Sequence, residues 1–354
     1  MLLEKKSQRK TLFRRLMVIF VVVLFAFALC GITAAAEETS DEQPAFEDTE
    51  RWGWPLDGVY DSIKTSLCEL LNNIFQGSFG LIDKVVKDAD AELGKTPANY
   101  DSTMFQTVEK VVNGVMIPIG SIVLVYVILY EFIQALIDKN SFHDFDTSIF
   151  IRFIFKSCLG IWFLSNCFTI VNALFDLGTY MVNGVTSSSG AAGTLSQAVN
   201  SFAQYLQPDK VSLSTLILII IPAGFLNIVS LVIYACVYVI LIGRMVEIYI
   251  HISVAPIPMA TLTNRDFGDT GKNYLKVIFA YALQAVFIMI AIVLYANLCG
   301  SRLTAALTEA SSFDAATLAS EINNNILFCI ALGIVLLLTM FKSGNVAKSI
   351  LNCH

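Results

Sequence analysis

Five long apolar stretches constrain this chain more than any other feature of its sequence. They cover residues 111–137, 149–175, 213–242, 274–298 and 325–341. Each has about 17 to 30 residues, the length with which a helix crosses a hydrocarbon core of about 30 Å. The composition agrees, because 56% of the 354 residues are hydrophobic and only 15% are charged. The sequence therefore predicts an all-α polytopic membrane protein with about five transmembrane helices.

A signal sequence is predicted over residues 1–36. Basic side chains come first, an apolar run covers 16–29, and three alanines, Ala34 to Ala36, stand just before a run of acids. This order is typical of a secretory signal peptide that is cleaved after Ala36, and an uncleaved signal anchor is the alternative. In both cases the segment that begins at Glu37 is extracellular.

That extracellular segment is expected to span residues 37–108. Its first fourteen residues contain seven acids, which is typical of a solvated tether. Between 55 and 93 apolar side chains recur at helical spacing, which predicts two amphipathic helices separated near Gly77 to Gly80. Their apolar faces need a partner, which can be each other, the bilayer surface or another subunit. The remainder, 109–354, is predicted to be the transmembrane domain.

The connectors between the apolar stretches predict the topology. Connectors 179–207 and 300–324 contain a single basic residue between them, whereas the connector 264–276 and the tail after 341 contain five: Arg265, Lys272, Lys276, Lys342 and Lys348. By the positive-inside rule the first two lie outside and the last two inside. The sequence thus predicts a multi-pass protein of the cell membrane with an extracellular N-terminal segment and a cytoplasmic C-terminus.

A proline-broken segment follows from this topology. The chain is outside near residue 208 and inside by 264, so the apolar residues between cross an odd number of times. Three crossings would leave fewer than about 18 residues each, so there is one, over 213–242. Residues 243–262 then form an interfacial or re-entrant segment. Pro256 and Pro258 are expected to break the helix there, because proline removes a backbone donor.

Three polar residues precede the prolines at helical spacing. Arg244 and Glu247 are one turn apart and can pair, and His251 lies one further turn along the same face. Three interpretations remain open from the sequence. The residues are an ion pair that marks the interface, or they take part in gating or coupling, or they touch the substrate.

Other polar residues in the apolar stretches predict contacts within the helix bundle. Glu131 either extends to the headgroups or pairs with Arg152 or Lys156, because unpaired charge in lipid is costly. Arg152 and Lys156 are otherwise anchors at the inner end of their span. Gln284 is expected to form an interhelical hydrogen bond worth about 1 kcal/mol.

Enzyme chemistry is not indicated. The histidines His143, His251 and His354 are scattered, and the cysteines show no ligand spacing, so no metal is expected. Residues 267–273 contain the Gly-Lys of a phosphate-binding loop, but Asp266 and Asn273 occupy positions that the motif gives to glycine and to serine or threonine. No catalytic residue and no cofactor is therefore predicted.

The order of features after residue 213 suggests a family. A long apolar span leads to Arg244-x-x-Glu247 and then to Ala255-Pro256-Ile257-Pro258-Met259-Ala260. A polar loop with Gly268 and Gly271 follows, and then the apolar run over 274–290. This order resembles the TrbL-type polytopic membrane subunit of conjugative type IV secretion systems. The acidic N-terminal segment is similar to the variant found in Gram-positive bacteria.

The resemblance implies a channel or scaffold subunit of a DNA transfer apparatus. Its partners would be other type IV secretion subunits, including ATPases and a coupling protein, further copies of itself, and the lipid bilayer. The cargo would be relaxase-bound single-stranded DNA, and contact with it is expected to be indirect, because the spans contain few Lys and Arg. A secondary transporter or channel for a small solute is the alternative. Such a protein needs broken helices in two related halves, for which Pro118 and Pro222 are available.

Overall fold

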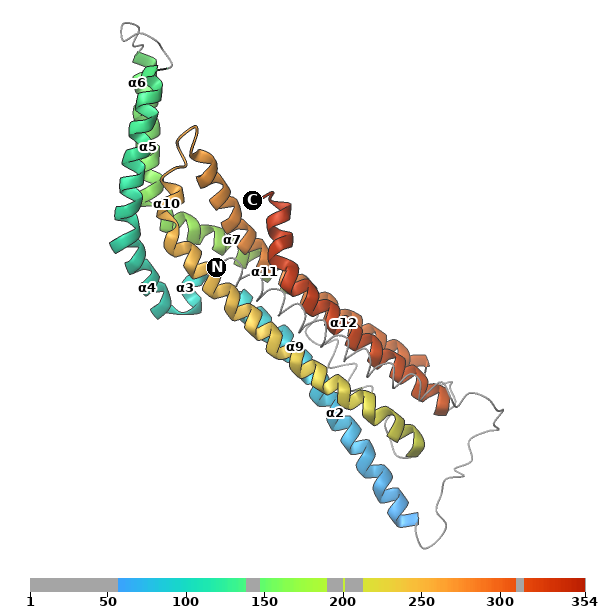
Figure 1. Cartoon of the computed structure of the whole chain (residues 1–354). Helices are drawn as coiled ribbons and strands as arrows, with labels where there is room; N and C mark the ends of the chain where they lie inside the picture. Colours follow the sequence, from blue (N-terminus) through green and yellow to red (C-terminus); the bar gives the residue numbers. More distant parts are fainter. Residues whose placement is uncertain (1–56, 138–146, 190–199, 201–212, 310–314, 354) are drawn as a thin grey trace, which may run out of the picture. The chain divides into compact units, whose positions relative to one another are not determined.

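A computed structural model describes residues 57–137, 147–189, 200, 213–309 and 315–353. The predicted signal segment, the acidic tether up to residue 50 and His143 lie outside these residues. Every regular element in the described part of the chain is a helix (Figure 1). The predicted all-α class is therefore confirmed.

The helices are long, and several run on directly into the next. In chain order they are α2 (Asp57–Leu93), α3 (Pro97–Tyr100), α4 (Ser102–Val111), the π-helical turn η1 (Val112–Met116), α5 (Ile117–Ile137), α6 (Thr147–Ser165), α7 (Cys167–Ser189), α9 (Leu213–Val254), α10 (Pro256–Met259), α11 (Gly268–Glu309) and α12 (Ala315–Ile350).

Membrane-spanning length is reached by four stretches of the described chain. They are Ser102–Gln134, Leu213–Val254, Gly268–Ala305 and Ser320–Ile350. A fifth arises if the bent pair Phe150–Ser165 and Cys167–Ser188 is one span. These stretches overlap all five apolar segments read from the sequence, because the backbone of a chain in lipid satisfies its hydrogen bonds by forming helices.

The second apolar stretch, expected as one span over 149–175, is bent by 65° between α6 and α7. The break lies at Asn166, whose side-chain Nδ2 donates to the carbonyl of Trp162 at 2.9 Å. Side-chain amides of this kind compete with the helix backbone for its carbonyls, and bends accompany them.

The chain divides into two compact units. The first comprises 1–78, 198–228 and 301–331, and the second comprises 79–197, 229–300 and 332–354. In the first unit, the early part of α2 packs on the early part of α9, where Asn227 Nδ2 donates to Ser78 Oγ at 3.2 Å. The second unit contains all the polar residues that the sequence singles out.

The prediction of two helices separated near Gly77 to Gly80 is wrong, because α2 is continuous from Asp57 to Leu93. A Cβ at Gly77 would lie 3.2 Å from Asn227 Nδ2 of α9, so this glycine marks a close helix approach. Glycine inside a helix costs about 1 kcal/mol, and the packing of α2 on α9 outweighs that cost. The partner of the apolar face of α2 is thus a helix of the same chain.

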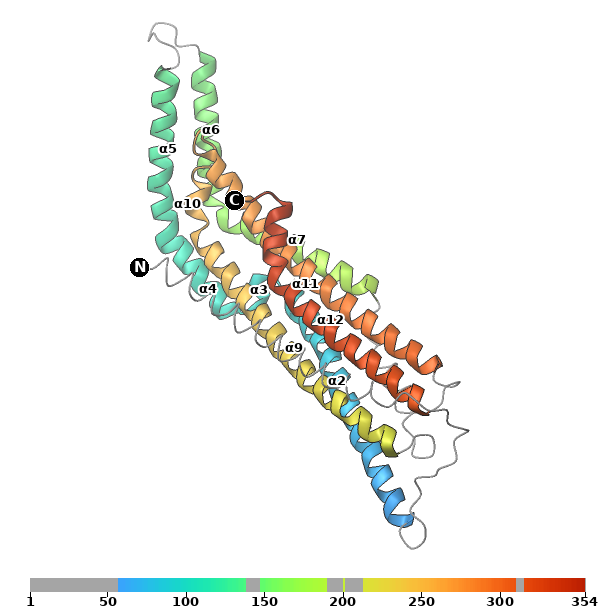
Figure 2. The ribbon, with the colours of Figure 1, turned by 45° about the vertical axis from the view of Figure 1, so that its right-hand side comes forward.

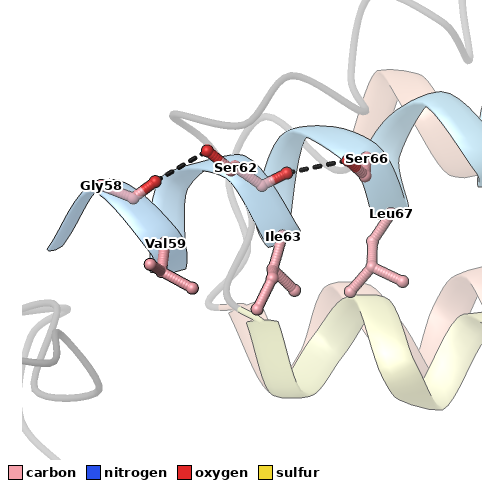
Figure 3. Close-up of a pocket in the computed structure, with 6 residues that line it drawn as sticks. All are labelled: Gly58, Val59, Ser62, Ile63, Ser66 and Leu67. Carbon is pink, nitrogen blue, oxygen red and sulfur yellow. Dashed lines mark hydrogen bonds between the residues drawn. The ribbon is translucent and has the colours of Figure 1, made fainter. Parts of the chain in front are cut away.

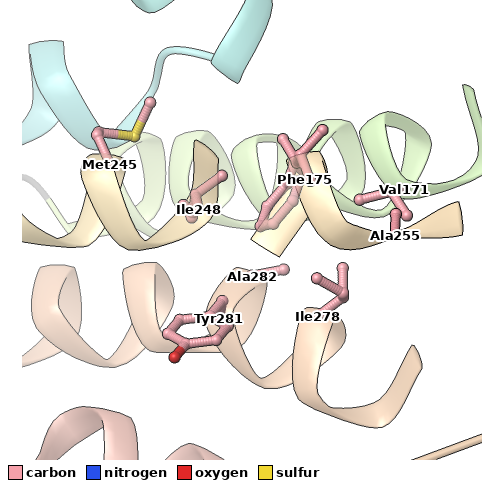
Figure 4. Close-up of a cluster of buried hydrophobic side chains, with 9 residues drawn as sticks. Val171, Phe175, Met245, Ile248, Ala255, Ile278, Tyr281 and Ala282 are labelled. Atoms are coloured by element: carbon pink, nitrogen blue, oxygen red, sulfur yellow. The ribbon is translucent and has the colours of Figure 1, made fainter. Parts of the chain in front are cut away.

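The core of the second unit lies where α7, α9 and α11 meet (Figure 4). Val171 and Phe175 come from α7, Met245 and Ile248 from α9, and Ala282 from α11, and each is buried. The close approach of α7 and α11 depends on small residues, since a Cβ at Gly178 would lie 2.9 Å from the Cβ of Ala282. In the same unit α11 and α12 run side by side (Figures 1 and 2), with Gly344 of α12 opposite Gln284.

Candidate functional site

The long helix α9 ends just before Ala255. Helix α9 continues to Val254, beyond the predicted end of the span at 242, and the single turn α10 covers Pro256–Met259. The two prolines thus lie where the long helix has stopped. Proline residues suit this position because they supply no backbone donor and start the new turn with a preset φ angle.

The broken backbone around α10 is enclosed by other helices. Ala255, Met259 and Ala260 are fully buried, and α5, α6 and α7 contact α10. A Cβ at Gly120 of α5 would lie 3.0 Å from the carbonyl oxygen of Pro256. One at Gly271 of α11 would lie 2.7 Å from that of Pro258. Irregular backbone at membrane depth is stable when it is packed against protein in this way.

Glu131 of α5 anchors the loop that follows α10. Its Oε1 accepts from Lys156 Nζ of α6 at 2.5 Å, and its Oε2 accepts from Asn264 Nδ2 at 2.7 Å. The other end of the Asn264 side chain accepts from the backbone N–H groups of Asp266 (2.8 Å) and Phe267 (2.9 Å). Asn264 is only 4% exposed, so this network fixes the loop from inside the protein.

Of the two basic partners that the sequence offers to Glu131, Lys156 forms the ion pair. Arg152, four residues earlier on α6, is exposed and forms no ion pair with any described residue. A second contact between α5 and the loop comes from Gln134, whose Nε2 donates to Asp266 Oδ2.

The predicted pairing of Arg244 with Glu247 is not formed. Arg244 is 7% exposed, and its Nη2 donates to the backbone carbonyl of Tyr281 on α11 at 3.4 Å. Glu247 is exposed, and no ion pair within the described chain joins the two. The spacing of Arg244 and Glu247 permits an ion pair. The guanidinium of Arg244 instead packs against α11, while the carboxylate of Glu247 remains at the surface.

Tyr281 joins three helices at this level. Its hydroxyl lies 3.1 Å from His251 Nε2 of α9, and it accepts from Lys348 Nζ of α12 at 3.4 Å. The lysine nitrogen is also 4.9 Å from the centroid of the tyrosine ring, within range of a cation–π interaction. In Figure 4 the hydroxyl of Tyr281 points away from the other labelled side chains. The main-chain carbonyl of His251 accepts in turn from Tyr274 at 2.7 Å.

Sequence reasoning missed Tyr281, Lys348 and Asn264. Tyr281 is one of twelve tyrosines and sits in an unbroken apolar run, so nothing local distinguishes it. Gln284, by contrast, was predicted to form an interhelical hydrogen bond, and its Nε2 donates to Ser343 Oγ of α12 at 3.4 Å.

Two hollows of the described chain are an open groove and a small gap. The groove, of about 370 Å³, follows one side of α2, where Val59, Ile63 and Leu67 point in the same direction (Figure 3). The gap, of about 10 Å³, lies beside Glu131 and Lys156 and holds at most one water. No group of three or more His, Cys, Asp or Glu within the described residues is arranged to hold a metal.

Comparison with protein families assigns the chain. Residues 82–256 match the family described as TrbL/VirB6 plasmid conjugal transfer like protein. This chain belongs to the TrbL/VirB6 family. It is therefore a component of a conjugal transfer, or type IV secretion, apparatus and a multi-pass membrane protein with several apolar helices.

The matched residues of this TrbL/VirB6 chain begin in α2 and end at Pro256. They include Glu131, Lys156, Arg244 and Glu247, whereas α11 and α12 lie outside them. Among curated proteins and solved structures, none matches the chain.

Proposed function

We propose that this TrbL/VirB6 chain is an integral membrane scaffold subunit of the DNA transfer channel. It assembles with further copies of itself around the translocation path, beside the ATPases and the coupling protein that supply energy and cargo. The observation that carries this proposal is the enclosed end of the bundle around α10. There α5, α6 and α7 surround α10, and Glu131 and Tyr281 each join elements that are distant in sequence.

A densely packed end of the bundle suits a scaffold, because a scaffold has to bear the force of partners that hydrolyse ATP. Its polar groups bind one another rather than a ligand: Lys156 pairs with Glu131, and Lys348 contacts Tyr281. The guanidinium of Arg244 is buried against α11. These cations are thus not arranged to bind phosphates, which supports indirect contact between this chain and the relaxase-bound strand.

The proposed orientation places the acidic N-terminal segment outside and the C-terminus in the cytoplasm. Arg265, Lys272 and Lys276 support it, because basic loops stay on the cytoplasmic side. The boundary between an extracellular segment over 37–108 and a transmembrane domain over 109–354 remains a prediction, as does a Gram-positive host.

A small-solute transporter is less well supported. It requires broken helices in two related halves. The bend between α6 and α7 is a second break besides the one at α10, but Pro222, which the sequence offered for this role, lies inside the continuous α9. Pro118 lies in the first turn of α5, directly after the π-helical turn η1, where the helix continues. Neither proline ends the helix that contains it.

Deletion of the gene from its conjugative element tests the proposal. We expect loss of DNA transfer, with restoration by the wild-type gene in trans. A variant with Asn264→Ala is expected to restore transfer only in part, while Gly243→Ala, at a position with open space around it, restores it fully. Transfer at the wild-type frequency from the deletion strain would refute the proposal, and loss of a solute uptake activity instead would favour the transporter.

A further inference from the structure

The hydroxyl of Tyr281 on α11 has polar neighbours from two other helices. His251 Nε2 of α9 lies 3.1 Å away, and Lys348 Nζ of α12 donates to the hydroxyl oxygen at 3.4 Å. An ammonium group has donors and no acceptor, so this contact leaves the single hydroxyl hydrogen of Tyr281 for His251. The Nε2 atom therefore accepts, which requires a neutral imidazole with its proton on Nδ1.

The charged side chains that act on this imidazole come from two helices. They are Lys348 of α12 and Glu247, one turn earlier on α9. Glu247 is exposed, so water screens its charge, whereas Lys348 is half-buried and shares the hydroxyl of Tyr281. Tyr274 of α11 donates to the main-chain carbonyl of His251 at 2.7 Å. The charge closest to the bonded side of the ring is thus that of a lysine, which forms no ion pair with any described residue.

Protonation of His251 is incompatible with this arrangement. An imidazolium has donors at both ring nitrogens, so the Tyr281 hydroxyl would lose the acceptor for its hydrogen. Two cations, His251 and Lys348, would then share one hydroxyl oxygen, and Arg244 adds a third at the backbone carbonyl of the same tyrosine. Tyr281 is 6% exposed, so water screens this repulsion poorly. Acidification therefore favours opening of the contact.

The C-terminal end of α12 is the part of the chain that this contact holds. Ala347 is fully buried and Lys348 is half-buried, whereas Ser349 and Ile350 after them are exposed. The contact of Lys348 with Tyr281 thus lies close to the end of the packed part of α12. Helix ends with few buried side chains open locally at a low cost in free energy. Loss of the Lys348 contact is therefore expected to release this end while the rest of the helix stays packed.

We propose that His251 is a proton-sensitive latch for the C-terminal end of α12. Neutral His251 holds the Tyr281 hydroxyl in place for Lys348 and keeps the latch closed. Protonated His251 repels Lys348 and releases the end of the helix. Histidine is the side chain whose ordinary titration falls between about pH 5 and 8, so the latch responds to mild acidification. The inference goes beyond the proposed function and does not depend on it.

Hydrogen exchange of the full-length protein in lipid nanodiscs, read by mass spectrometry, tests the proposal. Peptides that cover 342–353 are compared at about pH 8 and about pH 5.5, which bracket the titration of histidine. Each rate is divided by the intrinsic exchange rate at that pH. For the wild type we expect the opening equilibrium of this segment to rise about tenfold on acidification. A peptide of α7 that includes Val171 and Phe175, which are buried in the core, is the internal reference and is expected not to change.

Three variants identify the titrating group. His251→Gln keeps an acceptor for the Tyr281 hydroxyl but does not titrate, so protection of the end of α12 is expected to stay high at both pH values. Tyr281→Phe removes the shared hydroxyl and is expected to give fast exchange at both. Glu247→Gln, the matched control one turn from His251, is expected to keep the response of the wild type.

Equal corrected exchange of the wild type at the two pH values would overturn the inference. The same rise in His251→Gln as in the wild type, or loss of the rise in Glu247→Gln, would assign the titration to another group and overturn it as well. A rise of equal size in the α7 reference would show general loosening, which contradicts a latch. This last comparison uses the wild type alone, so it decides even where a variant does not fold.

Discussion

Removal of the Glu131 side chain is expected to lower the free energy of unfolding. Most of the loss comes from the hydrogen bond to Asn264, and less comes from the ion pair with Lys156. The Lys156 side chain is 45% exposed, so solvent screens its ion pair, which contributes at most about 1 kcal/mol. Asn264 is 4% exposed, and a buried amide left without its acceptor costs about 1 to 3 kcal/mol. Glu131→Ala is therefore expected to lower the free energy of unfolding by about 2 to 4 kcal/mol.

Two variants separate these contributions. Glu131→Gln keeps an acceptor for Asn264 and removes only the charge, so its expected cost is about 1 kcal/mol or less. Lys156→Ala is expected to have a similarly small cost. The free energies are measured by reversible unfolding in mixed detergent micelles, with helix content followed by circular dichroism. If Glu131→Gln or Lys156→Ala costs as much as Glu131→Ala, the ion pair dominates and the reasoning is refuted.

Three further outcomes are expected. Gly271→Ala brings a Cβ to 2.7 Å from the carbonyl oxygen of Pro258 in α10. It is expected to lower the free energy of unfolding by about 1 to 3 kcal/mol in the same assay. The control Gly243→Ala, which has open space around it, is expected to be neutral or stabilising. Tyr281→Phe removes the hydroxyl shared by two polar partners and costs about 1 kcal/mol, and an unchanged midpoint would contradict that bridge. Burial raises the pKa of the Cys68 thiol, so a maleimide mass tag is expected to modify Cys68 more slowly than Cys353, and equal rates would contradict its burial.

The helices and the location of the spans were predictable because the bilayer imposes them. A hydrocarbon core requires a long apolar stretch, and lipid leaves the backbone no alternative to internal hydrogen bonds. The bend at Asn166 was not predictable, because it depends on a side-chain amide that bonds a carbonyl one turn earlier. The continuity of α2 across Gly77 depends likewise on the approach of α9, which only the folded structure supplies.

In the candidate site, too, the sequence pattern identified polar residues but not the partners that packing gives them. The sequence identified Glu131, and helical spacing gave it two basic partners that it could not rank. The fold selects Lys156 and adds Asn264, which is distant in sequence. Helical spacing also suggested a pair between Arg244 and Glu247, which the fold separates because Arg244 packs against α11. Compensation by double charge reversal of these two residues is therefore not expected.

The most direct test of the account is to determine on which side of the membrane the loop after α10 lies. The account requires this loop to be cytoplasmic, because α9 is proposed to cross the membrane once. Thr270 is exposed at the start of α11 and suits a cysteine substitution. The account predicts that Thr270→Cys in intact cells is not modified by a membrane-impermeant thiol reagent and becomes reactive once the membrane is opened. Modification from the exterior of intact cells would contradict it.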